Sequence, residues 1–334
     1  MKKRSLSNSL LEKLKEGVYK EITEIVRIDP YLDMEMRGED GAMVYYRGGL
    51  ILTISEKDGL TGLTPEYYPE DYKGKLVPNI TNILEYINLA KHFVDIHEDM
   101  TNKLGEKEFQ QRVVFENNRS VNAANTDYFI ADVEWACEKP KKTDNGTVDE
   151  RAENDTFGGR ADIIAFRWNN LEHKKRLLQF TMIEVKQGDG AITTSETINK
   201  KGKIVVSPGL KKHYDDFLDF QSKKQSDKNY FQKVAYDMLS VIKQKIELGL
   251  VKGLDYLFKN SAGEPIEPQI EDEPDFIILL ANYHHYSSSL AKECEKLPQN
   301  CKFYLSSFMG YGLYKDFVFT KTQLQTIFPK IFTS

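Results

Sequence analysis

The sequence predicts an α/β protein in which helices cover both faces of a mixed β-sheet. The first indication is the order of elements after about residue 101, where segments of strand character and segments of helical apolar spacing follow one another. The second is residues 275–281, a continuous apolar run typical of a strand covered on both faces. The third is the pair of β-favouring runs 158–168 and 177–186, which a polar tip separates and which therefore predict two antiparallel strands.

Length and composition predict two domains. The chain has 334 residues, which is long for one core, and 40% of them are hydrophobic, which supports a sizeable packed interior. We place the boundary near Thr101, so that residues 1–100 form an N-terminal region and residues 101–334 form the main domain. The net charge of −5 provides no global basic field, and binding of nucleic acid must therefore depend on local basic patches.

The N-terminal region is expected to contain a helix, a small β-meander and a second helix. Apolar residues recur at helical spacing in 6–26 and again in 79–100. The strands of the meander are expected at 31–36, 43–46 and 50–54. Gly48-Gly49 is a suitable two-residue turn between the last two of these strands.

The main domain is expected to follow the order helix, strand, strand, strand, helices, strand. A helix is predicted at 106–118, and a strand at 128–135 precedes the antiparallel pair. The later helices are predicted at 210–223, 230–250 and 288–296, and the later strands at 275–281, 303–308 and 313–319. In the helix at 210–223, Tyr214, Phe217 and Leu218 are expected on one side. These elements predict an α/β sandwich on a mixed sheet.

The cysteines and the N-terminus indicate a cytoplasmic protein. Cys137, Cys294 and Cys301 are odd in number and lack the spacing of zinc ligands, so we expect free thiols in a reducing compartment. The basic start is not followed by the apolar core of a signal peptide, and no run approaches the ~18 apolar residues of a membrane span. We therefore expect no membrane partner.

The antiparallel pair brings together two carboxylates and an ammonium group. If the connecting loop is centred near residue 173, Asp162 lies opposite Glu184. Strand side chains alternate in direction, so Glu184 and Lys186 share one face while Val185 points to the other. Burying such charges costs several kcal/mol each unless they are paired or bind a metal, which makes this end of the pair the first place to expect chemistry.

Asp162 followed by Glu184-Val185-Lys186 across a hairpin resembles the motif of the PD-(D/E)XK nuclease superfamily, whose fold many restriction endonucleases share. The resemblance covers residues 106–281, includes the order of elements, and implies a restriction endonuclease-like fold. Ala161 stands where the family name has proline.

The resemblance also implies a cofactor and roles for the motif residues. Asp162 and Glu184 would bind Mg²⁺, with Mn²⁺ able to substitute, and the main-chain carbonyl of Val185 would complete the protein's share of ligands. Lys186 would lie beside the attacking water and stabilise the transition state. Glu108 resembles an acid that many members carry on the helix before the meander, and Glu116 on the same helix is an equal geometric candidate.

Other residues near the motif are candidates for contacts to nucleic acid. They are Arg160, Gln187, Lys211 and Lys212, with a further basic cluster at 200–203. Gln187 could instead cap the strand end, and most basic clusters are only solvated surface.

Two functions follow from these residues. The first is a metal-dependent nuclease that acts on nucleic acid, with DNA as the expected substrate and a restriction-like or antiphage role. The alternative is a non-catalytic nucleic-acid-binding or scaffolding protein of the same fold, whose acids do not hold metal. The motif residues also have a purely structural interpretation, in which Glu184 forms an ion pair with Lys186 or Arg160 at the end of the sheet. A homodimer or a protein partner stays open. Residues 1–100 carry no catalytic signature and could set the choice of substrate or partner.

Overall fold

The computed structural model describes residues 3–69, 72, 77–101, 105–136, 160–168, 176–193, 195–198, 204–207, 209–226, 230–260, 262–281, 288–306, 310–327 and 329. Its larger sheet has the strand order β13-β12-β11-β7-β6-β5, and β10 also pairs with β7. The strands are β5 (Tyr128–Ala136), β6 (Arg160–Trp168), β7 (Leu177–Gln187), β10 (Gln269–Ile270), β11 (Asp275–Ala281), β12 (Lys302–Leu305) and β13 (Val318–Thr320). The pairs β5–β6 and β6–β7 are antiparallel whereas β7–β11 and β11–β12 are parallel, so the sheet is mixed as the sequence predicts.

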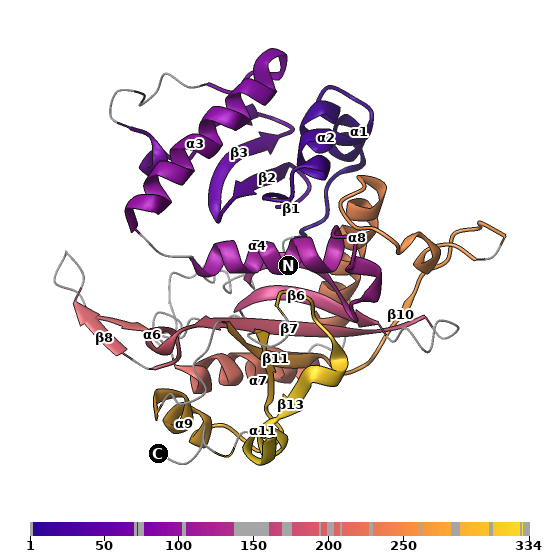
Figure 1. Cartoon of the computed structure of the whole chain (residues 1–334). Helices are drawn as coiled ribbons and strands as arrows, with labels where there is room; N and C mark the ends of the chain where they lie inside the picture. Colours follow the sequence, from indigo (N-terminus) through magenta and orange to yellow (C-terminus); the bar gives the residue numbers. More distant parts are fainter. Residues whose placement is uncertain are drawn as a thin grey trace, which may run out of the picture.

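Helices cover both faces of this sheet (Figure 1). One face packs against α4 (Glu106–Asn118), and the other packs against α7 (Leu210–Ser226), α8 (Tyr230–Glu247), α9 (Ser288–Glu295) and α11 (Lys321–Ile327). The alternation in β7 explains how one strand serves both layers. Phe180 and Met182 belong to the core beneath α7 and α8, whereas Ile183 and Val185 belong to the core beneath α4. The prediction of an α/β sandwich is therefore confirmed.

The N-terminal region forms a second sheet, four-stranded and antiparallel, in the order β1-β2-β3-β4. Its elements are α1 (Asn8–Lys15), α2 (Lys20–Ile28), β1 (Leu32–Met36), β2 (Gly41–Tyr46), β3 (Gly49–Ser55), β4 (Gly59–Thr61) and α3 (Ile83–Thr101). The single helix expected over 6–26 is wrong. The chain leaves the helix after Lys15, and the backbone N–H of Gly17 bonds the carbonyl of Glu12, a bond that ends a helix.

The turn between β2 and β3 lies one residue earlier than the sequence indicated. Tyr46 pairs with Gly49, so the two turn residues are Arg47 and Gly48 rather than Gly48 and Gly49. Both have positive φ, 48° and 83°, as a type I′ turn requires. Positive φ at Arg47 was not expected, because a side chain with a Cβ rarely adopts it.

The two parts of the molecule pack closely against each other. The core of the N-terminal region includes Val241, Leu248 and Leu250, which lie in α8 or directly after it. Lys245 of α8 and Glu35 of β1 form an ion pair at 2.8 Å, and both side chains are buried. The boundary predicted near Thr101 coincides with the end of α3.

Two further sequence expectations concern the cysteines and the membrane. Cys294 and Cys301 are buried free thiols, as expected, and burial raises the pKa of each to about 12. Cys137 lies outside the described residues. In the described part of the chain, no helix has both the length and the apolar character needed to cross a membrane.

Candidate active site

The acids of the hairpin meet at the end of the strand pair β6–β7. The pairing of β6 with β7 ends at Ile163 and Ile183, and Asp162 and Glu184 are the next residues of the two strands beyond that pair. The backbone N–H of Val185 donates to Oδ2 of Asp162 at 2.7 Å. The carboxylate of Asp162 is thereby held against the neighbouring strand, beside the segment that carries Glu184 and Lys186.

Glu184 and Lys186 share the sheet face that α7 covers. Nζ of Lys186 lies 2.6 Å from Oε1 of Glu184, and Nδ1 of His213 lies 2.9 Å from the same oxygen. The side chains of Glu184 and Lys186 are only 3% and 8% exposed, so their charges are compensated mainly by each other, and the histidine adds a hydrogen bond to Glu184. Val185, between them, points into the opposite core, as predicted.

His213 reaches the site because it belongs to the buried stripe of α7. Leu210, Phe217 and Phe220 occupy the core against the sheet, and His213 falls on the same stripe at helical spacing. The sequence placed Leu218 on the buried side, but Leu218 is 40% exposed. The sequence signal for His213 is its position as a polar residue on an apolar helical stripe, directly after a basic pair.

Glu106 contributes a third carboxyl group from the opposite helix. It is the first residue of α4, and the charges of Lys186, Glu184 and His213 act on it. The first turn of α4 contains two acids, Glu106 and Glu108. The charge of Glu106 also raises the pKa of Asp162. The sequence predicts Glu106 only as the first residue of this helix.

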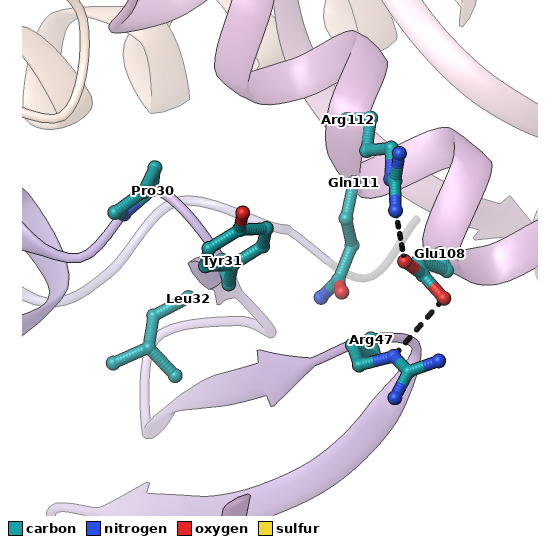
Figure 2. A pocket seen from close by; sticks show the side chains of 7 residues that line it. All are labelled: Pro30, Tyr31, Leu32, Arg47, Glu108, Gln111 and Arg112. Atoms are coloured by element: carbon teal, nitrogen blue, oxygen red, sulfur yellow. Dashed lines mark hydrogen bonds and ion pairs between the residues drawn. The ribbon is translucent and has the colours of Figure 1, made fainter. Parts of the chain in front are cut away.

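Glu108 lies between two arginines in the structure (Figure 2). Arg47 Nε is 3.2 Å from its Oε2, and Arg112 is 2.6 Å from its Oε1. Two positions along a helix correspond to about 200° around its axis, so Glu106 and Glu108 point in different directions. Glu108 faces the N-terminal sheet, in a narrow hollow that is also lined by Pro30, Tyr31, Leu32 and Gln111. Its contacts tie α4 to the turn at Arg47.

Glu116, the alternative acid of α4, accepts a hydrogen bond from the exposed Asn122 side chain at 3.1 Å. It lies towards the C-terminal end of α4, whereas Glu106 lies at its start. No contact connects Glu116 with the hairpin acids within the described residues.

The two hairpin carboxyl groups have opposite electrostatic environments. Burial acts to raise the pKa of Glu184, but the hydrogen bond and charge of His213 and the charge of Lys186 outweigh it and lower the pKa, so Glu184 is an anion. Burial and the charge of Glu184 raise the pKa of Asp162 well above the usual aspartate value, although Lys186 and the Val185 N–H oppose them. Such a separation between neighbouring acids is typical of functional sites.

Lys186 is a cation in this environment. Burial acts to lower its pKa, but the charges of Glu184 and Asp162 outweigh burial and raise the pKa above the usual lysine value. Burial also raises the pKa of Glu106, with Lys186 opposing and Glu184 reinforcing the shift. Among the described residues, the site therefore gathers three carboxyl groups around one lysine.

This donor set fits a hard divalent cation. A cation between Asp162 and Glu184 would relieve the repulsion that raises the pKa of Asp162. Magnesium keeps several waters and needs only one or two protein carboxylates, which the hairpin offers. Within the described residues no group of three or more His, Cys, Asp and Glu side chains is arranged to hold a metal, so the fit rests on these two acids.

The candidates for nucleic-acid contact lie around the same region. Lys211 and Lys212 are exposed on α7 and form ion pairs with Asp215 and Asp216 one turn later. Gln187 is half-buried at the end of β7. The side chain of Arg160 and the cluster 200–203 lie outside the described residues.

The fold and site define an α/β sandwich that carries a buried cluster of carboxylates, a lysine and a histidine at the end of β7. No family model and no solved structure matches the chain. A segment of 149 residues, 44% of the chain, is 26% identical to part of the CRISPR-associated endonuclease Cas9 of Staphylococcus aureus. The match spans 14% of the length of that protein, so the similarity to a nuclease is distant and partial.

Proposed function

We propose that the protein is a metal-dependent nuclease of the PD-(D/E)XK type. The observation that carries the proposal is the placement of Asp162 and Glu184 across one strand pair, with Lys186 on the face of Glu184, in a buried setting. A buried cluster in which carboxyl groups outnumber cations destabilises a fold once the acids ionise, unless a ligand compensates their charge. The distant similarity to a segment of an endonuclease supports the same class of activity.

In this proposal the residues of the site have separate roles. Asp162 and Glu184, with the carbonyl of Val185, would hold Mg²⁺ or Mn²⁺. When bound, the cation supplies Lewis acidity towards a phosphodiester and a nucleophilic water at neutral pH. Lys186, a cation beside these acids, would stabilise the negative charge that develops on the phosphate. Glu106 replaces Glu108 in this proposal as the acid from the helix, because its charge acts on both Asp162 and Glu184.

The substrate in this proposal is nucleic acid, with DNA as the first choice. The resemblance to restriction endonucleases supports DNA and a restriction-like or antiphage role. Lys211, Lys212 and Gln187 lie on elements that leave the site and are candidates for contacts to the phosphate backbone. To bind phosphate, Lys211 and Lys212 would give up their ion pairs with Asp215 and Asp216. The affinity for nucleic acid would then fall as the salt concentration rises.

One observation favours the non-catalytic alternative. Glu184 already forms a 2.6 Å ion pair with Lys186, which agrees with a structural role for both residues. In that case the cluster would stabilise the end of the sheet without metal, and the protein would bind nucleic acid without cutting it.

Cleavage assays with a matched pair of variants distinguish the two functions. Linear, circular, nicked, branched and single-stranded DNA and RNA are incubated with Mg²⁺ or Mn²⁺, with and without chelator. We expect the wild type to cut at least one DNA substrate only with metal, and Glu184→Gln to be inactive. Glu24→Gln, which changes an exposed glutamate paired with Lys20, is the control and should retain full activity. Absence of cleavage of every substrate by the wild type would support the binding protein instead.

A further inference from the structure

We infer that His213 is a positioning residue that, together with Lys186, fixes the carboxylate of Glu184 for a divalent cation. This inference rests on the proposed function and adds a residue that is not part of the sequence motif. It depends on how the two donors meet Glu184, on the other polar atom of the imidazole, and on the helix that carries His213.

Both donors bind the same oxygen of Glu184. Lys186 Nζ and His213 Nδ1 lie 2.6 Å and 2.9 Å from Oε1, and within the described residues neither they nor other groups bond Oε2. Two donors on one oxygen fix the rotation of the carboxylate and leave the other oxygen available. Ligating carboxylates are commonly held by such hydrogen bonds from residues that do not touch the metal.

The imidazole has no other polar contact in the described part of the chain. Nδ1 carries the proton that it donates to Glu184, and Nε2 is buried without a hydrogen-bond partner among these residues. A buried, unpaired ring nitrogen is costly. An apolar side chain would fill the same space without that cost, so packing alone does not account for a histidine here. The contact with Glu184 does.

The helix gives this contact a fixed geometry. Leu210, Phe217 and Phe220 anchor the same stripe of α7 in the core, and Phe217 stacks on Phe276 of β11 at 5.1 Å between ring centroids. His213 thus approaches Glu184 from α7, a helix packed on the sheet, and not from β7, the strand that carries Glu184. Groups held in this way orient a ligand with little loss of conformational freedom.

Two amide variants test which ring nitrogen matters. The side-chain nitrogen of asparagine corresponds in position to Nδ1 of histidine, and that of glutamine corresponds to Nε2. We therefore expect His213→Asn to bind Mn²⁺ within about threefold of the wild type, and His213→Gln to lose about tenfold or more in affinity. Calorimetric titration of the full chain with Mn²⁺ alone measures both, and thermal unfolding without metal verifies that each variant is folded.

The outcomes separate this inference from the proposed function. Equal Mn²⁺ affinity in the wild type, His213→Asn and His213→Gln overturns the positioning role while leaving the nuclease proposal intact. Absence of Mn²⁺ binding by the wild type overturns both. If His213→Gln does not fold, His213→Leu takes its place, because leucine keeps the apolar packing and lacks the donor. Wild-type affinity in His213→Leu would again contradict the inference.

Discussion

Asp162 accepts a hydrogen bond from Val185, yet burial and the charge of Glu184 raise its pKa well above the usual aspartate value. The folded protein therefore holds this proton at a pH where the unfolded chain has released it. Stability is greatest, as far as this group is concerned, below the usual aspartate pKa, and it falls as the pH rises towards the raised pKa. Without metal, Asp162 weakens the fold at neutral pH.

Asp162→Asn should therefore raise the melting temperature of the metal-free protein at neutral pH, because asparagine carries no charge and its carbonyl can still accept from Val185. The gain should disappear at a pH below the usual aspartate pKa, where the wild type is protonated too. Thermal unfolding across this pH range, with chelator present, measures it. Asp215→Asn, an exposed aspartate in an ion pair with Lys211, is the control and should change little. A lower melting temperature for Asp162→Asn at neutral pH would contradict this account.

The residues of the site differ in how far the sequence could predict them. Asp162, Glu184 and Lys186 lie on two strands joined by one loop, so alternation and a loop centre near residue 173 were enough to place them together. His213 belongs to a helix that reaches them only through the packing of α7 on the sheet, which no local pattern specifies. Glu106 and Glu108 share a helical turn, and only the orientation of α4 distinguishes them.

Among the elements, α8 connects the two sheets. Its buried Lys245 pairs with Glu35 of β1, a residue whose pKa burial raises and Lys245 lowers. Arg119, which follows α4, also donates to the main-chain carbonyls of Val26 and Leu32 in the N-terminal region. These polar contacts fix how the N-terminal elements sit on α4 and α8.

Lys245→Met should destabilise the protein by about 3–5 kcal/mol, since it leaves the Glu35 carboxylate buried without its partner. The double variant Glu35→Leu with Lys245→Met should regain most of that loss, because the uncompensated charge is gone. Chemical denaturation of both variants gives the free energies. If the double variant is as unstable as the single one, the pair contributes more through packing than through charge.

The turn at Arg47 and Gly48 forms a second contact between the N-terminal region and the main domain. A Cβ added to Gly48 would lie 2.6 Å from Cβ of Lys107, whereas one added to Gly263, at nearly the same φ, would meet nothing within 4 Å. Gly263→Ala should cost only the backbone strain of about 1–2 kcal/mol. Gly48→Ala should cost more, because α4 must also move. If Gly48→Ala and Gly263→Ala lose the same free energy of unfolding in denaturation experiments, the turn is not in close contact with α4.

The elements that the sequence misplaced are those in which a local signal competes with tertiary contacts. The glycine pair suggested a turn at Gly48-Gly49, but Gly49 is in the strand, where Val94 and Tyr67 crowd its Cα from the side a Cβ would occupy. The hairpin β8 (Ser195–Ile198) and β9 (Ile204–Ser207) was not predicted, because only its second strand is apolar. The run 230–250 has one strong helical period and the run 275–281 is apolar almost throughout, and both element types were predicted correctly, although α8 ends three residues earlier, at Glu247.

At the scale of the whole molecule, the described residues in the two cores of the larger sheet all lie after the predicted boundary. The core of the N-terminal region, by contrast, includes Val241, Leu248 and Leu250 of the main domain. The dependence between the two parts is therefore unequal.

We predict that the fragment 101–334 folds cooperatively but is less stable than the full chain. Loss of residues 1–100 uncovers Val241, Leu248 and Leu250, at roughly 1.5–3 kcal/mol for each side chain fully exposed. Circular dichroism and thermal unfolding of the fragment measure this. A fragment without a cooperative transition would mean that the N-terminal sheet completes the fold and that the two-domain organisation is wrong.

We propose above all that the acids of the hairpin bind a metal and that Lys186 acts on the substrate. The most direct measurement is the single-turnover rate of DNA cleavage in Mg²⁺ by Lys186→Ala, with Mn²⁺ affinity measured in parallel. Lys186→Ala should lose about a hundredfold or more in rate yet bind Mn²⁺ nearly as the wild type does, because removal of the competing ammonium charge offsets the loss of one of the two donors to Glu184. Lys20→Ala, at an exposed ion pair, should cleave normally. Cleavage by Lys186→Ala at the wild-type rate would contradict the claim.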